Sequence, residues 1–455
     1  MTQTVWQQGK LIEITITDLS DTGDGVGRWN ERVVFVPDTV PGDRVLVRLT
    51  YVKPQYAHGS LTQLLESSAY RLDPSCIVAD KCGGCQWQHI SYEYQLEAKR
   101  NQVIQALQHI GGFVQPPVDR VLTAPSSLNY RNKATYPLAI SRAGQVQAGY
   151  YQKRSHQLIN LNQCPVQDSR LNPLLLEVKQ DIQNQGWEIY NEQRHTGVLR
   201  HLSLRIGRRT GEMLLTLVAK DWNLPGIKNM AYIWLKRYPH LVGVCLNRNP
   251  DRTNAIFGDQ TRCIAGNPYL REQFAGLEFQ VRPDTFFQVY TESAEALLTV
   301  ISSELNFQGN EVLLDTYCGI GTLTLPLAQQ VYCATGLELQ PEAVKQAILN
   351  AQINNINNVS FITGAVEKLL PKLEIKPDVV VLDPPRKGCD RSVIDTLLLV
   401  KPRRIIYVSC KPATLARDLK LLCQNGVYKI TRVQPADFFP QTAHVETVAF
   451  AVLSD

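Results

Sequence analysis

Two short runs of aliphatic residues, Val379 to Leu382 and Ile405 to Val408, constrain the fold of this chain more than any other stretch. The first run is followed at once by Asp383 and two prolines, and the second by a serine and Cys410. Continuous apolar runs of this length predict parallel strands that are buried on both faces. In open α/β sheets the chemistry lies just beyond the carboxyl ends of such strands. We therefore expect the Asp383 carboxyl and the Cys410 thiol to face one crevice.

The residues from Pro283 onward alternate between strand and helix patterns, which predicts a doubly wound α/β sheet. A strand is expected at 312–315, followed by a turn with two glycines at 317–322 and a helix that begins at Leu323. Glu338 ends the next expected strand, about 20 residues further on, where a carboxylate can hold ribose hydroxyls. This arrangement suits NAD as well as S-adenosylmethionine, although the turn lacks the third glycine of a Gly-x-Gly-x-x-Gly motif.

Composition narrows the cellular and chemical context of the protein. The 455 residues carry a net charge of +5, with 44% hydrophobic and 20% charged residues, which fits a globular protein and permits a polyanionic partner. The first ten residues contain no apolar core of a signal peptide, and no run of about 18 apolar residues occurs. We therefore expect a cytoplasmic protein with no membrane partner and no obligate protein partner. In that compartment the eleven cysteines indicate metal binding or catalysis before disulfides.

Four cysteines have a spacing that is typical of a metal site: Cys76, Cys82, Cys85 and, far along the chain, Cys164. Three thiolates at spacings of six and three residues, plus a distant one, can surround a tetrahedral site. Two glycines between Cys82 and Cys85 allow backbone N–H groups to approach cluster sulfides, and a proline follows Cys164, as in iron–sulfur proteins. Spacing alone fits zinc as well, and four unrelated buried cysteines are the plain alternative.

The first part of the chain, residues 10–66, predicts a small β-barrel. Alternating runs at 11–16, 33–36 and 44–49 are separated by glycine- and proline-containing turns. Cations and aromatic residues, the mixture that binds single-stranded RNA, are interleaved along it. They are Arg28, Trp29, Arg32, Arg48, Tyr51, Lys53 and Tyr56. The alternative interpretation is an ordinary solvated barrel surface.

The middle of the chain predicts one helix and then a mixed, largely β region. Apolar residues at helical spacing indicate a helix from Tyr92 to Ile110, which Gly111 and Gly112 end. A basic block follows in the β region, and its strand at 202–206 is expected to carry arginines on one face, where they suit RNA phosphates and splayed bases. Its members are Arg194, His195, Arg200, His201, Arg205, Arg208 and Arg209. A solvated edge strand is the alternative.

Five motifs, in this order along the chain, resemble those of the RNA (uracil-5-)-methyltransferase family. They are Phe286-Phe287-Gln288, the Asp-Thr-Tyr-Cys-Gly-Ile-Gly-Thr stretch from Asp315, the Asp-Pro-Pro-Arg-Lys-Gly stretch from Asp383, the Val-Ser-Cys-Lys-Pro stretch from Val408, and His444-Val445-Glu446-Thr447. Residues 129–137 resemble an RNA-contacting strand of that family, and the predicted barrel resembles its OB-like TRAM domain. The likeness covers nearly the whole chain.

The resemblance implies an α/β protein in four parts. Residues 1–67 would be a TRAM-like OB barrel that binds RNA, and residues 68–124 an iron–sulfur segment with a connecting helix. Residues 125–280 would be a mixed, largely β central RNA-binding domain that completes the cluster with Cys164. Residues 281–455 would be a Rossmann-like, doubly wound methyltransferase domain.

The resemblance also implies roles for individual residues. Contacts with S-adenosylmethionine are implied for Gln288, Tyr317, Glu338 and Asp383, and ligation of a [4Fe-4S] cluster for Cys76, Cys82, Cys85 and Cys164. Cys410 would be the nucleophile and Glu446 the base. Two positions depart from the family pattern. Tyr290 stands where the family often has asparagine, and Ala365 stands where an aspartate or asparagine often contacts adenine.

The implied chemistry explains why a thiol and an acid are needed. Uracil C5 is a poor nucleophile, and a thiolate that adds to C6 turns the ring into an enolate whose C5 can take a methyl group. A base then removes the C5 proton so that the thiol can leave. Positive neighbours must favour the thiolate, and Arg386, Lys387 and Lys411 are the candidates. Amino-group methyltransferases have an aromatic residue after Asp-Pro-Pro, so Arg386 at that place fits a carbon target.

The barrel and the cysteine set together resemble the 23S ribosomal RNA branch of the family, which makes a 23S rRNA uridine the expected substrate and tRNA the alternative. A base inside a duplex cannot reach a thiol, so the target uridine is expected to be flipped out or already unpaired. An alternative from another class is a non-catalytic iron–sulfur RNA-binding protein whose methyltransferase half has degenerated. The intact set of Cys410, Glu446, Asp383 and Gln288 argues against it.

Overall fold

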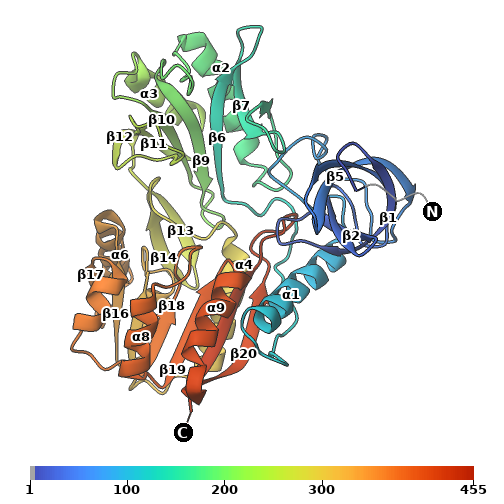
Figure 1. Ribbon diagram of the computed structural model, residues 1–455. Coiled ribbons are helices and arrows are strands. Elements are labelled where there is room, and N and C mark those ends of the chain that lie inside the picture. Colours follow the sequence, from blue (N-terminus) through green and yellow to red (C-terminus); the bar gives the residue numbers. More distant parts are fainter. Residues whose placement is uncertain (1–5, 455) are drawn as a thin grey trace.

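The structure is a computed structural model that describes residues 6–454. An N-terminal barrel, a central sheet and a C-terminal sheet lie around a common junction (Figure 1). This architecture confirms the predicted α/β class with an N-terminal barrel and a Rossmann-like C-terminal domain. Residues 1–5 and 455, which belong to the first and last predicted parts, lie outside the described residues. Within residues 6–454 no helix is both long enough and apolar enough to cross a membrane.

The barrel is closed by five strands in the order β1-β2-β3-β5-β4. The strands are β1 (Leu11–Leu19), β2 (Gly25–Trp29), β3 (Arg32–Val36), β4 (Arg44–Val52) and β5 (Tyr56–Glu66). Alternate residues of β1, including Ile12, Ile14 and Ile16, point into its core, as the period of two requires. A Cβ at Gly59 would lie 2.1 Å from Val47 Cγ1, so only glycine fits at this position of β5, which pairs with β4.

One helix, α1 (Tyr92–His109), connects the barrel to the rest of the molecule. Its bounds confirm the expected helix within one residue, and Gly112 follows it with a φ of 78°. The helix lies beside α9 (Pro412–Leu422) and below the barrel (Figure 1). Val103 and Leu107 pack into the same core as Leu415 of α9, so α1 is part of the C-terminal domain's covering layer.

The central sheet has seven strands in the order β12-β11-β10-β9-β6-β7-β8. Its elements are β6 (Lys133–Ile140), β7 (Val146–Tyr151), β8 (Leu158–Asn160), α2 (Leu171–Gln185), β9 (Leu199–Ile206), β10 (Met213–Ala219), α3 (Ile227–Arg237), β11 (Leu241–Arg248) and β12 (Gln260–Gly266). Helices α2 and α3 cover one face, where Trp234 is fully buried. The mixed, largely β prediction for this region therefore matches the observed elements.

The arginines of β9 correct one expectation. Strand β9 is interior to the sheet, not an edge, and both Arg200 and Arg205 are buried. The Arg200 guanidinium donates to the carbonyls of Asn249 and Asp251 at 2.8 and 2.7 Å, and Arg205 donates to the carbonyl of Arg282 at 3.0 Å. These side chains donate hydrogen bonds to buried loop carbonyls that would otherwise have no partner. The prediction that the arginines face RNA is therefore wrong for both Arg200 and Arg205.

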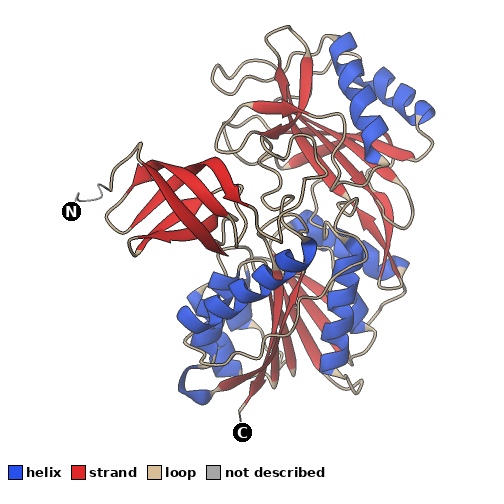
Figure 2. Ribbon diagram, turned by 90° about the vertical axis from the view of Figure 1, so that its right-hand side faces the viewer, coloured by secondary structure: helices blue, strands red, loops and turns tan. Residues whose placement is uncertain are grey.

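The C-terminal sheet has seven strands in the order β17-β16-β15-β18-β19-β21-β20, preceded by the hairpin β13 (Leu270–Phe274) and β14 (Leu277–Val281). The strands are β15 (Val312–Thr316), β16 (Cys333–Glu338), β17 (Val359–Thr363), β18 (Val379–Leu382), β19 (Arg404–Ser409), β20 (Tyr428–Ala436) and β21 (Glu446–Leu453). Helices cover both faces (Figure 2), which is the expected doubly wound arrangement. They are α4 (Thr291–Leu305), α5 (Thr324–Ala328), α6 (Pro341–Ile353), α7 (Val366–Leu369), α8 (Arg391–Val400) and α9, with short 3-10 turns η1 (Leu370–Lys372) and η2 (Gln424–Gly426).

The first five strands run parallel, and β21 then inserts antiparallel between β19 and β20. All four residues of β18 are buried, as the uninterrupted apolar run predicted.

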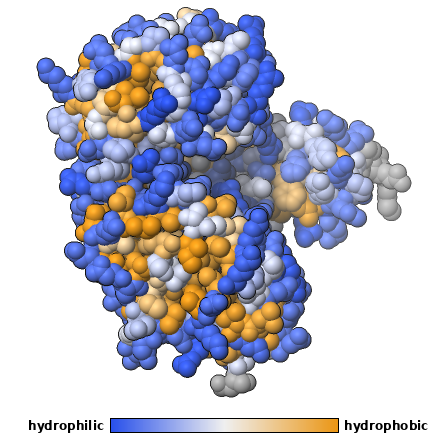
Figure 3. All heavy atoms as spheres, turned by 90° about the vertical axis from the view of Figure 1, so that its left-hand side faces the viewer, coloured by the Kyte–Doolittle hydropathy of each residue, from blue (hydrophilic) through white to orange (hydrophobic). Residues whose placement is uncertain are grey.

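On the face shown in Figure 3, apolar residues gather over the lower, C-terminal half of the molecule. Helix α6 has exposed apolar side chains, Ile348, Leu349 and Ile353.

The loop between β20 and β21, residues 437–445, is tied to the other units by buried polar contacts. Lys99 of α1 forms an ion pair with Asp437 at 2.6 Å, and both side chains are fully buried. Gln95 of α1 donates to Gln441 Oε1 at 3.1 Å and accepts from the Gln441 N–H at 3.0 Å. The Tyr130 hydroxyl donates to the carbonyl of Pro440 at 3.0 Å. Helix α1 and the central unit therefore fix this loop.

Replacement of Lys99 by methionine should destabilise the protein strongly, because it leaves the Asp437 carboxylate buried without its cation. Removal of one partner of a buried pair typically costs about 3–5 kcal/mol. The loss is measured as a shift in the denaturant midpoint of Trp and Tyr fluorescence. Lys345→Met is the control, since Lys345 forms an exposed pair with Glu342 and such pairs contribute little. Equal midpoints for the two variants would show that the buried pair does not hold the loop.

Candidate active site

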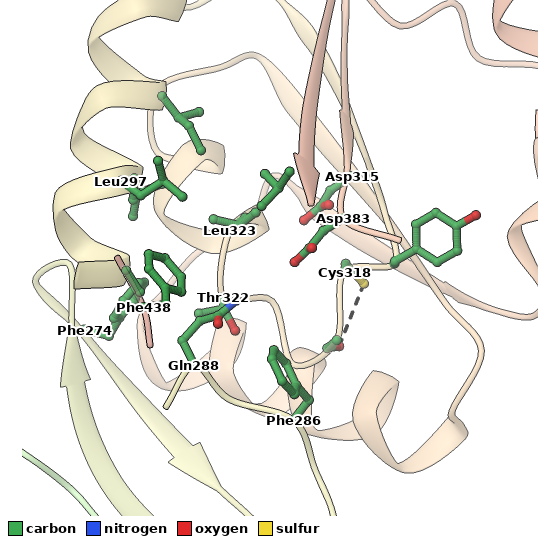
Figure 4. Close-up of a pocket in the computed structure, with 16 residues that line it drawn as sticks. Phe274, Phe286, Gln288, Leu297, Asp315, Cys318, Thr322, Leu323, Asp383 and Phe438 are labelled. Atoms are coloured by element: carbon green, nitrogen blue, oxygen red, sulfur yellow. Dashed lines mark hydrogen bonds between the residues drawn. The ribbon is translucent and has the colours of Figure 1, made fainter. Parts of the chain in front are cut away.

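The site lies at the carboxyl ends of β15, β18 and β19, the edge of the sheet that the apolar runs of the sequence predicted. Asp315 is the last buried acid of β15, Asp383 follows β18 and Cys410 follows β19. Figure 4 shows the carboxyl groups of Asp315 and Asp383 side by side at the strand ends, turned toward one pocket. Parallel strands end at one edge of the sheet, which explains why residues so far apart in the chain meet here.

The pocket in Figure 4 lies between the strand ends, α4 and the segment that precedes α4. Three of the four residues predicted to contact the cofactor line it, namely Gln288, Tyr317 and Asp383. The fourth, Glu338, stands behind the glycine turn. It accepts the N–H of Gly319 at 3.1 Å and that of Gln340 at 2.7 Å. Its carboxylate therefore shapes the turn that lines the pocket.

The turn after β15 keeps space open in the pocket. Tyr317 and Gly319 both have positive φ, at 65° and 56°. A Cβ at Gly319 would meet no atom within 4 Å, so the backbone there faces open space instead of packed side chains. The Cys318 N–H donates to the Leu337 carbonyl at 2.9 Å and anchors the turn to β16. A ligand can thus approach the backbone closely at this turn.

The protonation states of two buried carboxyl groups, those of Asp315 and Asp383, set the charge of the pocket. Burial raises the pKa of Asp315 to about 7, Thr324 lowers it by a hydrogen bond, and Asp383 raises it by charge repulsion. Burial likewise raises the pKa of Asp383 to about 7. A cation in the pocket would favour the ionised form of both groups, so the pocket suits a positively charged ligand such as a sulfonium. Asp315 begins one of the family-like motifs, and no role was predicted for it, although its position before the glycine turn could have indicated one.

Cys410 lines a second cavity, with a volume of about 570 Å³. Its walls come from three units: Phe35 and other barrel residues, His109 and its neighbours at the end of α1, and Arg386 and His444 from the C-terminal domain. The space-filling view shows the surface hollowed between the barrel and the rest of the molecule (Figure 3). The thiol therefore lies at the bottom of a cleft that a large substrate can enter from outside.

The sheet register places Glu446 next to Cys410. Strands β19 and β21 are antiparallel with Ser409 opposite Thr447, so the next residues along the two strands are Cys410 and Glu446. Burial raises the pKa of Glu446 well above its ordinary value, Asp383 raises it further, and Arg386 lowers it. Burial also raises the pKa of the Cys410 thiol, as does Glu446, whereas Arg386 lowers it through charge and a hydrogen bond. Thiol, acid and guanidinium are thus in direct electrostatic contact.

The four predicted metal-ligand cysteines come together. Cys76, Cys82, Cys85 and Cys164 line one cavity of about 310 Å³, which Arg131, Arg386 and His444 also line. Burial raises the pKa of Cys85 to about 12, and the other three thiols raise it as well by repulsion between their charges. Among residues 6–454 no group of three or more His, Cys, Asp or Glu side chains is arranged to hold a metal ion. A single tetrahedral ion would need all four thiolates within about 2.3 Å of it.

The predicted RNA-binding residues of the barrel divide into two groups. Tyr51 and Tyr56 are 47% and 38% exposed and lie near His58, which stacks on Phe35 with ring centroids 5.2 Å apart. Lys53 lies 5.4 Å from the centroid of Tyr51. These residues continue the surface of the Cys410 cleft, since Phe35 lines both. The second group makes contacts within the barrel itself. Trp29 stacks on Trp6 and Arg32 lies over the Trp6 ring, whereas Arg28 and Arg48 donate hydrogen bonds to the carbonyls of Glu31 and Gly9.

Comparison with protein families gives two matches. The tRNA (Uracil-5-)-methyltransferase family model matches residues 267–452, which include the C-terminal sheet and the strand-end residues described above. The TRAM domain model matches residues 5–62, most of the barrel.

Two relatives and one solved structure match nearly the whole chain. An uncharacterized RNA methyltransferase of Nostoc sp. is 75% identical over 454 residues, which are 100% of this chain and 99% of the relative. One of Synechocystis sp. is 58% identical over 98% of this chain and 96% of the relative. The crystal structure of the Pyrococcus abyssi tRNA (uracil-54, C5)-methyltransferase in complex with S-adenosyl-L-homocysteine has 29% identity and a TM-score of 0.77. It covers 97% of this chain and 100% of that one.

The raised pKa values of the two pocket carboxyls predict that affinity for S-adenosylmethionine increases from pH 6 to pH 8. Asp315 and Asp383 are largely protonated below pH 7 and ionised above it, and only the ionised forms attract the sulfonium. The gain is about tenfold for each pKa unit by which the sulfonium lowers these values. Calorimetric titration measures it, with S-adenosylhomocysteine, whose sulfur is neutral, as the matched control. Equal pH dependence for both ligands would contradict the assignment.

Proposed function

This chain belongs to the RNA methyltransferase family with a tRNA (uracil-5-)-methyltransferase catalytic domain and a TRAM domain, and we propose that it methylates C5 of a uridine through a covalent adduct with Cys410. One observation carries this proposal. The register of β19 and β21 sets the Cys410 thiol beside the buried Glu446, with Asp383 between them and the pocket that suits a sulfonium.

Each residue of the site has one task in the proposed reaction. Cys410 adds as a thiolate to C6 of the uracil, and Arg386, which lowers the pKa of this thiol, favours the reactive form. The methyl donor, S-adenosylmethionine, supplies an electrophilic methyl group, and Gln288, Tyr317 and Asp383 would hold it in the adjacent pocket. Glu446 then removes the C5 proton, and the Cys410 sulfur leaves C6. Burial makes Glu446 a strong base once it is ionised.

The RNA would enter through the cleft above Cys410. Its walls belong to the barrel, to α1 and to the C-terminal domain, so a nucleotide has to leave any duplex before its uracil reaches the thiol. The aromatic patch of Phe35, Tyr51, Tyr56 and His58 lies at the barrel side of this cleft. Aromatic faces with a nearby lysine accept unpaired bases by stacking. We assign this patch to the nucleotides that flank the target uridine.

We propose 23S ribosomal RNA as the substrate, with tRNA as the second candidate. The barrel and the cysteine set together support the first. The second is favoured by the tRNA (uracil-54, C5)-methyltransferase of P. abyssi, which matches 97% of this chain. A tRNA enzyme can therefore have the same succession of domains, and architecture alone does not choose between the two RNAs.

Methyl-labelled S-adenosylmethionine distinguishes the substrates. The protein is incubated in parallel with unmodified 23S rRNA and unmodified tRNA, and the labelled nucleotide is mapped. We expect label as 5-methyluridine in the ribosomal RNA. Label in tRNA alone would keep the chemistry and overturn the substrate. No label in either RNA, with the cofactor still bound, would support a non-catalytic RNA-binding protein.

Two substitutions test the proposed mechanism. Cys410→Ala should abolish methylation and any covalent adduct with RNA that contains 5-fluorouridine, because no thiolate is left to add to C6. Glu446→Gln should slow turnover about 100-fold, the usual effect of removing a general base, and should accumulate the adduct with natural RNA on denaturing gels. Cys423→Ser, at the end of α9 and away from the site, is the matched control and should turn over normally. Methylation by Cys410→Ala would exclude the mechanism.

We propose further that Cys76, Cys82, Cys85 and Cys164 bind a [4Fe-4S] cluster. The support is that all four thiols line one cavity, where burial and the neighbouring thiols raise the pKa of Cys85 and Cys164, an effect that bound iron would relieve. The cavity is close to the segments that shape the proposed active site. The segment around Trp87 hydrogen-bonds to Gln441, whose loop leads to Glu446. We therefore assign the cluster a structural role in holding this loop.

Iron and sulfide analysis of protein purified without oxygen tests the cluster proposal. We expect about four of each per chain for a [4Fe-4S] cluster. Cys85→Ser should lose iron, sulfide and brown colour, whereas Cys333→Ser, a cysteine at the start of β16, should keep all three. Zinc in place of iron, or iron retained by Cys85→Ser, would overturn the assignment.

A further inference from the structure

Cys245 and Cys263 face each other on neighbouring strands of the central sheet, apart from the cluster cysteines and from Cys410. They are directly paired in the antiparallel register of β11 and β12, next to an irregularity between Val244 and Cys245. Residues that oppose each other in such a pair have Cα atoms about 4.5–5.5 Å apart, which lies within the span of about 4.4–6.8 Å that a disulfide bridges. The two side chains also project from the same face of the sheet, and a hydrogen bond joins them.

The two thiols differ sharply in their surroundings. Cys263 is exposed on β12, the edge strand of the sheet, and its Sγ donates to the Gly266 carbonyl at 3.3 Å. Cys245 is only 1% exposed and packs in the core that also contains Phe274 and Phe287. An external reagent can therefore reach Cys263 but not Cys245.

The hydrogen bond between the two thiols shifts their pKa values in opposite directions. The Cys245 thiol lowers the pKa of Cys263, and the positive charge of Arg282 lowers it further. The same hydrogen bond, together with burial, raises the pKa of Cys245. An exposed thiol of low pKa beside a buried thiol is the arrangement of an attacking and a resolving cysteine.

We propose that Cys245 and Cys263 are a thiol-modification site that forms a reversible disulfide by exchange with an external disulfide. In the first step the Cys263 thiolate attacks one sulfur of that disulfide, and a mixed disulfide forms as one thiolate leaves. In the second step Cys245 Sγ attacks Cys263 Sγ and the mixed disulfide breaks. The second thiolate leaves and takes up the proton that Cys245 loses. The two cysteines lose two electrons, and the external disulfide gains them as it becomes two thiols.

The site lies at the junction between the central sheet and the segment that leads to the cofactor pocket. Arg282, which interacts electrostatically with both thiols, accepts a hydrogen bond on its carbonyl from Arg205 and forms an ion pair with Asp284 at 3.6 Å. This segment continues to Gln288. Exchange at the pair requires neither Cys410 nor RNA, so the inference stands apart from the proposed methylation.

Oxidised glutathione is the probe for this site. Trypsin cuts the chain into the peptides Tyr238–Arg248 and Cys263–Arg271, each with one cysteine. The full-length protein, purified without oxygen, is treated with oxidised glutathione, alkylated, digested and analysed by mass spectrometry. We expect the two peptides to appear joined, two hydrogens lighter than their sum, and to separate again on reduction.

Variants separate the two steps. Cys263→Ser should lose the joined peptides and leave Cys245 unmodified, because the buried thiol is out of reach. Cys245→Ser should leave Cys263 carrying one glutathione, because no resolving thiol is present. Cys333→Ser is the control and should form the joined peptides like the wild type. Wild-type protein in which Cys263 stays free, or ends as a stable mixed disulfide with glutathione, would overturn the proposal.

Discussion

The buried ion pair of Lys99 and Asp437 is the constraint on which the active site depends. Two charges without solvent exposure are tolerated only if their partners are fixed, and here the partners belong to α1 and to the loop that precedes Glu446. Gln95 and Tyr130 attach the same loop to α1 and to the central unit. Glu446, at the start of β21, follows a loop that is thereby fixed by three distant parts of the chain, which explains how the proposed general base can be held in one position.

The antiparallel insertion of β21 is the second constraint. An all-parallel sheet would put the amino end of its last strand at the opposite edge, and a residue there could not reach Cys410. Because β21 runs the other way, its first residue, Glu446, lies at the same edge as the last residue of β19, Ser409. The register, and not a flexible loop, brings acid and thiol together. The rise that Glu446 adds to the pKa of the buried Cys410 thiol follows directly from this geometry.

Local patterns predicted what depends on local physics. The runs at 379–382 and 405–408 are buried strands because nothing polar interrupts them, and the barrel's alternation and the α1 periodicity are equally direct. The arginines of β9 were misjudged for a related reason. Alternation shows which face a side chain takes but not which buried carbonyls lie there. Arg200 and Arg205 donate to carbonyls that are 49 and 77 residues away in the chain. The residues expected to bind the cofactor or a metal were predicted from motifs. The periodicity of a strand does not show which strand ends lie next to each other in the folded sheet.

Arg386 and His444 belong to a wall that two cavities of different chemistry share. Both line the Cys410 cleft and also the cavity of the four cysteines, so one wall separates a reacting thiol from a set of thiols that repel each other when charged. A positive group in that wall is favourable to both sides, because a guanidinium stabilises thiolates on either face. The cysteine segment and the catalytic loop are thus electrostatically linked as well as hydrogen-bonded. A change in the segment that carries the four cysteines would therefore be felt at the Cys410 cleft through this shared wall.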